Sequence, residues 1–413
     1  MSGQRGPRGA SWAPLVGMDA TGPPSPWAGA LRGRPVRLCH PDAEHRMNLS
    51  VESVPIITPR VPSVRPPVPA EPPGPDASRA DPVRESVLAM PAVFPLEHGG
   101  ELRDARLAWR LVGAAGAPVV CALGGISANR EICLANDPRN GWWSEIVGPG
   151  GALDTDEYQV LGFDYLGGSG DSTGPEPGAA GPTAERRVFP SISSYDQAEA
   201  LAQLLDHLGL ASLAAIAGGS YGGMVGLAFA ERYPERVARL IVIGAPDRSH
   251  PLATAWRSVQ RRIVSLAAAC GQAQEGLKVA RALAMTTYRS AAELAARFGG
   301  SAFRDGQRFV FPVEEYLFAR GCDYATRHRA ESFLTLSESI DLHRVDASRV
   351  FVPTTVVAVR EDQLVPLEDL RALAARLPHG RLHEISSIYG HDAFLKESYQ
   401  LRGIFRAALG SPK

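Results

Sequence analysis

The sequence has few cysteines, no long apolar run and no excess of charge of either sign. Cys39, Cys121, Cys133, Cys270 and Cys322 are scattered among 413 residues and form no C-x-x-C pair. This pattern argues against a disulfide framework or a structural zinc site, and it indicates a reducing compartment, which we expect to be the cytoplasm. No stretch approaches the roughly 18 apolar residues that span a bilayer, so a membrane protein is excluded. The net charge of −1 disfavours a basic nucleic-acid-binding protein.

Proline is the residue type that stands out, because 17 of the 34 prolines fall between Pro7 and Pro82. Proline lacks a backbone donor and fixes φ, so this stretch cannot form a sheet ladder or a long helix. We therefore expect residues 1–85 to be a disordered extension. A transit peptide, or a natural start at Met47 or Met90, remains open as an explanation. We expect a chain that begins near Met90 to keep full activity.

The remaining sequence alternates short apolar runs with helical patterns, as βαβ units do around a mostly parallel sheet. Its expected strands are Leu107–Val112, Pro118–Leu123, Gln159–Phe163, Leu213–Ala217, Leu240–Gly244, Pro353–Val359 and Leu382–Ile385. Its expected helices are Ser194–Leu208, Tyr221–Arg232, Leu367–Leu377 and Ala393–Leu409. Residues 249–346 show helical patterns only, such as Trp256–Ala269, Gly276–Tyr288 and Val313–Thr326. The sequence thus predicts a core over 86–248 and 347–413 with an inserted helical cap.

The most informative motif is Gly218-Gly219-Ser220-Tyr221-Gly222, which fits G-x-S-x-G between a predicted strand and a predicted helix. In that context the motif forms a tight turn that exposes a nucleophilic serine at the carboxyl edge of the sheet. The glycines are needed because the turn leaves no room for a Cβ atom. A small-residue turn before a helix is the plain structural alternative.

A serine nucleophile requires a base and an acid. In α/β proteins that carry this serine turn, the three residues follow one another along the chain in the order Ser, Asp, His. Asp362 follows the strand Pro353–Val359, where its carboxylate can lie at the same edge as Ser220; Glu361 is a competing acid, and a helix cap is the alternative role. His391 lies in the loop between the last strand and the last helix. These residues predict a Ser220–His391–Asp362 triad.

Two backbone amides are expected to bind the oxyanion of an acyl-transfer intermediate. One is the amide of Tyr221, and the other belongs to Leu123 or its neighbour Gly124, where paired glycines let the backbone approach an acyl group. A purely structural turn is the alternative for the glycines.

From about residue 92 to 409 the chain resembles the homoserine O-acyltransferases of the α/β-hydrolase fold. The matching stretches are Gly141-Trp142-Trp143, Leu153-Asp154-Thr155-Asp156, Leu166-Gly167-Gly168 with Ser172-Thr173-Gly174-Pro175, Gly218–Met224, Ala280-Arg281 with Thr287-Tyr288-Arg289, and Tyr389–Leu395. Several of these have no role in a general hydrolase, so their joint occurrence is more specific than the serine turn alone.

The resemblance implies roles for further residues. The family's nucleophile, acid and base fall on Ser220, Asp362 and His391. Its amino-acid-binding pair falls on Arg281, which suits a carboxylate through its guanidinium fork, and on Asp392, which suits an ammonium group. A surface arginine and a helix N-cap are the structural alternatives. The resemblance also implies a homodimer.

One residue of the predicted cap bears on the identity of the acyl donor. Acetyl-transferring members of the family have asparagine near the start of the first cap helix, where this sequence has Arg257. A fixed cation there would pair with the distal carboxylate of a succinyl group. A solvated arginine and a contact to a coenzyme phosphate are the alternatives.

The sequence therefore predicts a homoserine O-succinyltransferase that uses succinyl-CoA as co-substrate and holds no permanent cofactor or metal. The alternatives are homoserine O-acetyltransferase, serine O-acyltransferase and, more distantly, an esterase or thioesterase. A non-catalytic binding protein with this fold is disfavoured, because no triad member is missing.

Overall fold

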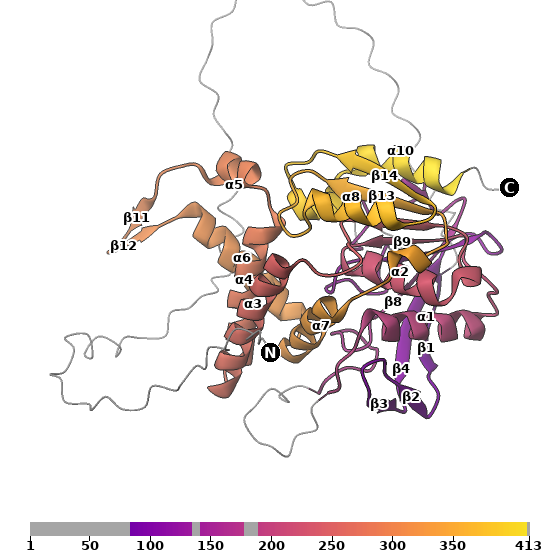
Figure 1. The fold of residues 1–413 in the computed structure, drawn as a ribbon. Helices are drawn as coiled ribbons and strands as arrows, with labels where there is room; N and C mark the ends of the chain where they lie inside the picture. Colours follow the sequence, from indigo (N-terminus) through magenta and orange to yellow (C-terminus); the bar gives the residue numbers. More distant parts are fainter. Residues whose placement is uncertain (1–82, 134–140, 177–188, 411–413) are drawn as a thin grey trace, which may run out of the picture. The chain divides into compact units, whose positions relative to one another are not determined.

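The computed structural model describes residues 83–133, 141–176 and 189–410. The expected disordered extension over residues 1–85 thus lies outside the described residues except for its last three. The described chain forms an eight-stranded sheet in the order β1-β4-β8-β5-β9-β10-β13-β14 (Figure 1). The strands are β1 Val83–Ala89, β4 Arg106–Val112, β5 Val119–Leu123, β8 Gln159–Phe163, β9 Ala215–Gly219, β10 Leu240–Ile243, β13 Thr354–Val359 and β14 Gly380–Ile385.

The strands from β8 to β14 in this order run parallel, and β4 is antiparallel to both of its neighbours. The expected mostly parallel sheet is therefore confirmed, and each expected strand overlaps an observed one. The helices that follow strands are α1 Ser194–Leu208, α2 Tyr221–Arg232, α8 Leu367–Arg376, α9 Ala393–Lys396 and α10 Ser398–Leu409. The single helix expected over Ala393–Leu409 is wrong, because it breaks at Glu397 into α9 and α10.

Both faces of the sheet are buried, because side chains alternate between two hydrophobic cores. In β10, Leu240 and Val242 belong to the core under α1, α2 and α8, whereas Ile241 and Ile243 belong to the core under α10. Burial on both faces explains why the central strands read as continuous apolar runs. It also leaves the carboxyl ends of β5, β9, β13 and β14 as the edge where polar loops can gather.

Strand β1 corrects the predicted N-terminal boundary. Its residues Val83–Ala89 pair antiparallel with Arg106–Val112 of β4, so residues 83–85 belong to the sheet and not to an extension. Most side chains of β1 are exposed, and this edge strand therefore carries no hydrophobic pattern that sequence reasoning could detect. Short pairs β2 Val93–Pro95 with β3 Glu101–Arg103, and β6 Val147–Gly148 with β7 Leu153–Asp154, were also missed.

Five helices lie between β10 and β13, and we call them the cap helices: α3 Pro251–Ala269, α4 Ala273–Tyr288, α5 Ala291–Phe298, α6 Pro312–Arg327 and α7 Ala330–Leu342. Figure 1 shows α3, α4 and α6 grouped beside the sheet. The expectation of helices alone was incomplete, since the hairpin of β11 Phe303–Asp305 and β12 Arg308–Val310 interrupts them. None of the described helices is both long and apolar enough to cross a membrane.

Candidate active site

The serine turn forms as the motif predicts. Strand β9 ends at Gly219 and α2 begins at Tyr221, so Ser220 sits between them with φ 54° and ψ −124°. A Cβ atom on Gly222 would lie 2.3 Å from the carbonyl oxygen of Leu123, and one on Gly218 would lie 2.4 Å from that of Gly222. The close packing of the backbone therefore holds Ser220 in a conformation that L residues rarely adopt.

The structure brings Ser220, His391 and Asp362 together. His391 Nε2 lies 2.8 Å from Ser220 Oγ, and His391 Nδ1 lies 2.7 Å from Asp362 Oδ2. Histidine and aspartate are 4% and 6% exposed, whereas the serine is half-buried. The tautomer that donates from Nδ1 to the carboxylate leaves Nε2 free to accept the serine proton. This arrangement can generate an alkoxide-like nucleophile.

The second oxygen of Asp362 is held by the backbone that follows it. Oδ1 accepts hydrogen bonds from the amides of Leu364 at 2.8 Å and Val365 at 2.9 Å, which leaves Oδ2 facing the histidine. The competing acid Glu361 turns away and accepts a 2.7 Å hydrogen bond from the amide of Ser387. Burial is the largest single influence on the pKa of Glu361 and raises it, but the hydrogen bonds to the carboxylate together outweigh burial and lower the pKa. Geometry therefore selects Asp362 and not Glu361.

The environment of His391 favours its charged form. Burial disfavours a charge on the ring, but the Asp362 carboxylate acts in the opposite direction, through its charge and its hydrogen bond, with a smaller push from Asp392. The carboxylates prevail, and the pKa of His391 lies above its ordinary value. A histidine whose pKa is raised in this way can still take up a proton near neutral pH.

The two expected oxyanion donors, the amides of Tyr221 and Leu123, lie in different surroundings. The Tyr221 amide is the first of α2, and it donates no hydrogen bond to any of the described residues. Leu123 ends β5 and is 2% exposed, whereas Gly125 lines the cavity and its Cβ position lies 4.0 Å from Ser220 Cβ. The carbonyl of Gly124 accepts from the amide of Gly222, which ties this loop to the serine turn.

A cavity of about 160 Å³ opens in front of Ser220 between the loops at the sheet edge and the cap helices. Arg281 of α4 lines it with its guanidinium carbon 4.6 Å from the ring centre of Tyr324 and 5.1 Å from that of Tyr288. Among the described residues Arg281 forms no ion pair with an acidic side chain, although its charge opposes the rise in the pKa of Asp392. Asp392 lines the same cavity beside His391. The two expected substrate-binding residues are thus brought together with the nucleophile.

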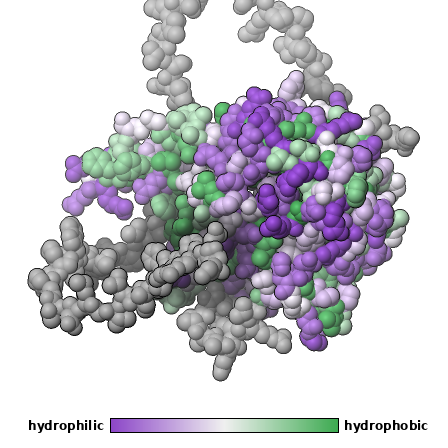
Figure 2. Space-filling model, in the orientation of Figure 1, coloured by the Kyte–Doolittle hydropathy of each residue, from purple (hydrophilic) through white to green (hydrophobic). Residues whose placement is uncertain are grey.

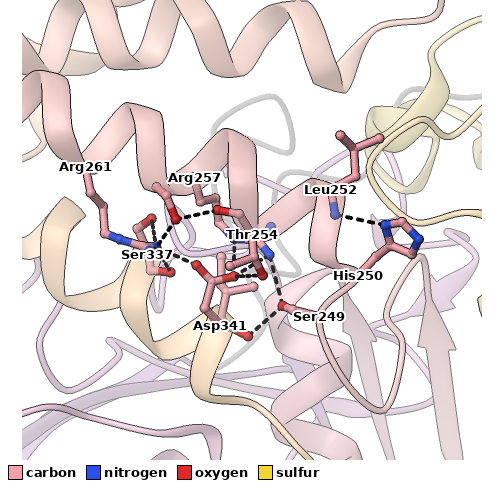
Figure 3. A network of polar contacts seen from close by, with 10 residues as sticks. Ser249, His250, Leu252, Thr254, Arg257, Arg261, Ser337 and Asp341 are labelled. Atoms are coloured by element: carbon pink, nitrogen blue, oxygen red, sulfur yellow. Dashed lines mark hydrogen bonds and ion pairs between the residues drawn. The ribbon is translucent and has the colours of Figure 1, made fainter. Parts of the chain in front are cut away.

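Arg257 lines the cavity too, but it is not a free cation. It is 7% exposed, and it donates from Nε at 2.9 Å and from a terminal nitrogen at 2.6 Å to Asp341 of α7. Arg261, one turn further along α3, donates to the other oxygen of Asp341 at 2.6 Å. Figure 3 shows this carboxylate between the two guanidinium groups. Since two arginines share one acid, the cluster keeps one net positive charge.

Sequence reasoning missed several residues of this region. Asp341 lies on a helix that carried no signal, 84 positions from its partner Arg257. Tyr324 supplies one of the two rings under Arg281, and a tyrosine on an amphipathic helix is indistinguishable from a core residue. No group of three or more His, Cys, Asp or Glu side chains that could hold a metal ion occurs in the described ranges.

Comparison with known proteins shows the family of the chain. Residues 118–398 match the family of the alpha/beta hydrolase fold. A homoserine O-succinyltransferase of Xanthomonas campestris is 43% identical over 318 residues, covering 76% of this chain and 82% of that protein. The chain belongs to the homoserine O-acyltransferases. A homoserine O-acetyltransferase of Thermus thermophilus is 38% identical over 287 residues, covering 66% of this chain and 72% of that protein. The family assignment made from the motifs is therefore confirmed, and with it the class of acyltransferase.

Solved structures share the fold of this acyltransferase. The homoserine O-acetyltransferase of Staphylococcus aureus superposes with a TM-score of 0.67 at 25% identity and covers 80% of this chain and 96% of its own. Esterase E22 superposes with a TM-score of 0.70 at 20% identity, covering 79% of this chain and 100% of its own. At that identity the esterase bears on the fold alone, so the α/β-hydrolase fold expected from the sequence is confirmed.

Proposed function

We propose that this acyltransferase moves a succinyl group from succinyl-CoA to the hydroxyl of L-homoserine in two steps, as a cytoplasmic enzyme of methionine biosynthesis. One observation carries the proposal: Ser220, aligned with His391 and Asp362, opens into a cavity whose wall holds Arg281 and Asp392. Such a transfer requires a nucleophile and side chains that bind both charged groups of an amino acid. The family supports homoserine as the acceptor, and the similarity to the Xanthomonas homoserine O-succinyltransferase supports succinyl as the group transferred.

In the first step Ser220 Oγ attacks the thioester carbonyl while His391 takes the serine proton. The negative charge on the carbonyl oxygen is stabilised by the Tyr221 amide and by an amide of the loop after β5. The sequence assigned this second amide to Leu123, and the lining of the cavity favours Gly125. His391 then gives the proton to the departing thiolate, which leaves as coenzyme A. Asp362 stabilises the charged imidazole throughout.

In the second step homoserine binds with its carboxylate on Arg281 and its ammonium on Asp392. His391 takes the proton of its hydroxyl, whose oxygen attacks the acyl carbonyl, and the same proton returns to Ser220 as the acyl–serine bond breaks. Water competes for the acyl group, so transfer depends on the bound acceptor filling the cavity between the loops and the cap helices.

The succinyl donor is favoured by the net positive charge around Arg257. The distal carboxylate of a succinyl group would meet this charge at the cavity wall, whereas an acetyl group has nothing to place there. An acetyl donor is the second candidate, because Asp341 already neutralises part of that charge and the Thermus relative is an acetyltransferase.

The decisive experiment follows coenzyme A release from succinyl-CoA and from acetyl-CoA, each with homoserine, with serine and without acceptor. We expect release to depend on homoserine and to be faster with succinyl-CoA. Equal release without an acceptor would instead make the protein a thioesterase. The Ser220→Ala variant should lose at least about 10³-fold in turnover, and an active variant would refute the acyl-serine.

We also propose a homodimer that forms through the cap helices. Leu252, Val259 and Leu266 are 49%, 53% and 53% exposed and recur every seven residues on α3, which places them on one helix face. Figure 2 shows further hydrophobic side chains at the surface of the part that holds α5 and the hairpin, where Phe309 is 65% exposed. Light scattering should give twice the chain mass, and Val259→Glu should give a monomer.

A further inference from the structure

Arg289 lies behind Asp392 as seen from the cavity. It follows α4 and precedes α5, and one of its terminal nitrogens is 3.2 Å from Asp392 Oδ2. The two side chains are 15% and 13% exposed, so the pair is largely shielded from water. Asp392 lines the cavity and Arg289 does not. None of the described residues forms a hydrogen bond or ion pair with Asp392 Oδ1, which leaves that oxygen for a ligand.

The other side of Arg289 is held by a second acid. Glu293, in the first turn of α5 and 3% exposed, accepts from Arg289 Nη1 at 3.3 Å and from Arg297 at 3.0 Å. Charges therefore alternate from Arg297 through Glu293 and Arg289 to Asp392. An ammonium group on Asp392 would extend this alternation by one position.

The backbone around Arg289 is fixed against the loop that carries Asp392. Gly390 has φ +57°, and a Cβ atom on it would lie 3.0 Å from the carbonyl oxygen of Tyr288 and 3.1 Å from the amide of Ser290. Ser290 Oγ donates to the carbonyl of Ile388, and Gln363 Nε2 donates to the carbonyl of Arg289 at 3.2 Å. The position of Arg289 relative to Asp392 is thus set by several independent contacts.

We propose that Arg289 is a positioning residue for the acceptor: it keeps Asp392 ionised and turns its free oxygen toward the amino group of the incoming amino acid. The inference rests on the proposed function and adds a residue that touches no substrate. A buried carboxylate without a cation either takes up a proton or rotates toward another donor. Neither form would bind an ammonium group well.

The charges around Asp392 support this role. Burial raises the pKa of Asp392, and Arg289 is the strongest opposing group, ahead of Arg281 and His391, while Asp362 adds to the rise. Arg281 lines the cavity and His391 is the base, so Arg289 is the one of these three cations that neither lines the cavity nor takes part in the proton transfers. Replacing Arg289 therefore raises the pKa of Asp392 further.

The test compares Arg289→Met and Arg289→Lys with the unchanged enzyme. We expect Arg289→Met to raise KM for homoserine at least about tenfold, because Asp392 loses the cation that keeps it ionised, while kcat and the single-turnover acylation by succinyl-CoA change less than about threefold. Arg289→Lys should restore most of the affinity. Arg297→Met is the matched control, since it removes a guanidinium from Glu293 without touching Asp392.

The pH dependence separates positioning from a general structural defect. KM for homoserine should rise at acidic pH in Arg289→Met over a range in which the unchanged enzyme is flat. An unchanged KM in Arg289→Met, or a fall in acylation as large as the loss of affinity, would overturn the inference. An unchanged enzyme that is not acylated by any acyl-CoA would overturn the proposed function itself and this inference with it.

Discussion

The phenolic hydroxyl of Tyr165 donates a 2.7 Å hydrogen bond to the carbonyl oxygen of Gly124. The same oxygen accepts the 2.8 Å hydrogen bond from the amide of Gly222. The loop after β5 and the serine turn therefore meet at one atom, and the orientation of that carbonyl fixes where the following amide of Gly125 points. Tyr165 is 2% exposed and its ring packs edge-on against that of Tyr221, so its hydroxyl has little freedom.

Replacing Tyr165 by Phe should slow acylation. The variant keeps the ring packing and loses one of two hydrogen bonds to Gly124, worth about 1 kcal/mol or roughly fivefold in rate if the bond orients an oxyanion donor. Stopped-flow measurement of coenzyme A release would show this, with KM for homoserine unchanged. Tyr233→Phe removes a hydroxyl that binds Glu199 instead and serves as the control; an equal loss in both variants would contradict the explanation.

The acid limb of the pH profile should report His391. Because its pKa is raised and the neutral form is the base, activity should fall as pH drops through a midpoint above the ordinary value of about 6.5. The midpoint should move to lower pH in Asp362→Asn, whose residual activity will be small. Measurement of kcat/KM for the acyl-CoA against pH checks the direction, and a midpoint that stays in place would mean that another group is titrating.

Arg257 and Arg261 allow the donor preference to be traced to one contact. Arg257→Asn should lower kcat/KM for succinyl-CoA relative to acetyl-CoA at least about tenfold, because the succinyl carboxylate would be buried without a cation. Arg261→Asn removes the same charge from Asp341, but Arg261 does not line the cavity. A shift in Arg257→Asn alone identifies a direct contact. Equal shifts would indicate the field of the cluster, and no shift would remove the case for succinyl.

A chain that begins at Met90 should be less stable than a chain that includes β1. It lacks β1, whose Glu85 forms ion pairs with Arg110 and Arg130, and it leaves the edge of β4 unpaired and open to association. We expect a thermal midpoint lower by a few degrees and aggregation on heating, with activity per folded molecule preserved. A chain that begins at Asp81 is the control, and equal stability of the two would contradict a role for β1.

The hydrogen-bonded arrangement of Ser220, His391 and Asp362 could be predicted because it depends on position in the fold. Strand-to-helix turns at the carboxyl edge of a parallel sheet converge, so Ser220, Asp362 and His391 were identified from the strands that precede them. The choice between Asp362 and Glu361 was not available from spacing alone. It required the amides of Leu364 and Val365, which turn one carboxylate toward the histidine.

The partners of charged residues could not be predicted. Arg257 was expected to offer a free charge, yet Asp341 of α7 pairs with it and Arg261 binds the other oxygen of the same carboxylate. No local sequence pattern indicates such packing between helices. Arg289 lies in a stretch that matches the family, but the sequence assigns it no role, because its contact with Asp392 depends on how two loops meet. Strand β1 escaped notice for a different reason: an exposed edge strand is specified by backbone pairing and not by apolar periodicity.

The conformation of Ser220 has a consequence for the evolution of the chain. A non-glycine residue held at φ 54° and ψ −124° costs about 1–3 kcal/mol of folding free energy. Glycine adopts these angles freely, so a chain with glycine in this place would be the more stable one, although it could no longer be acylated. Selection for thermal resistance alone would thus favour loss of the nucleophile, and the serine persists only where the reaction is under selection.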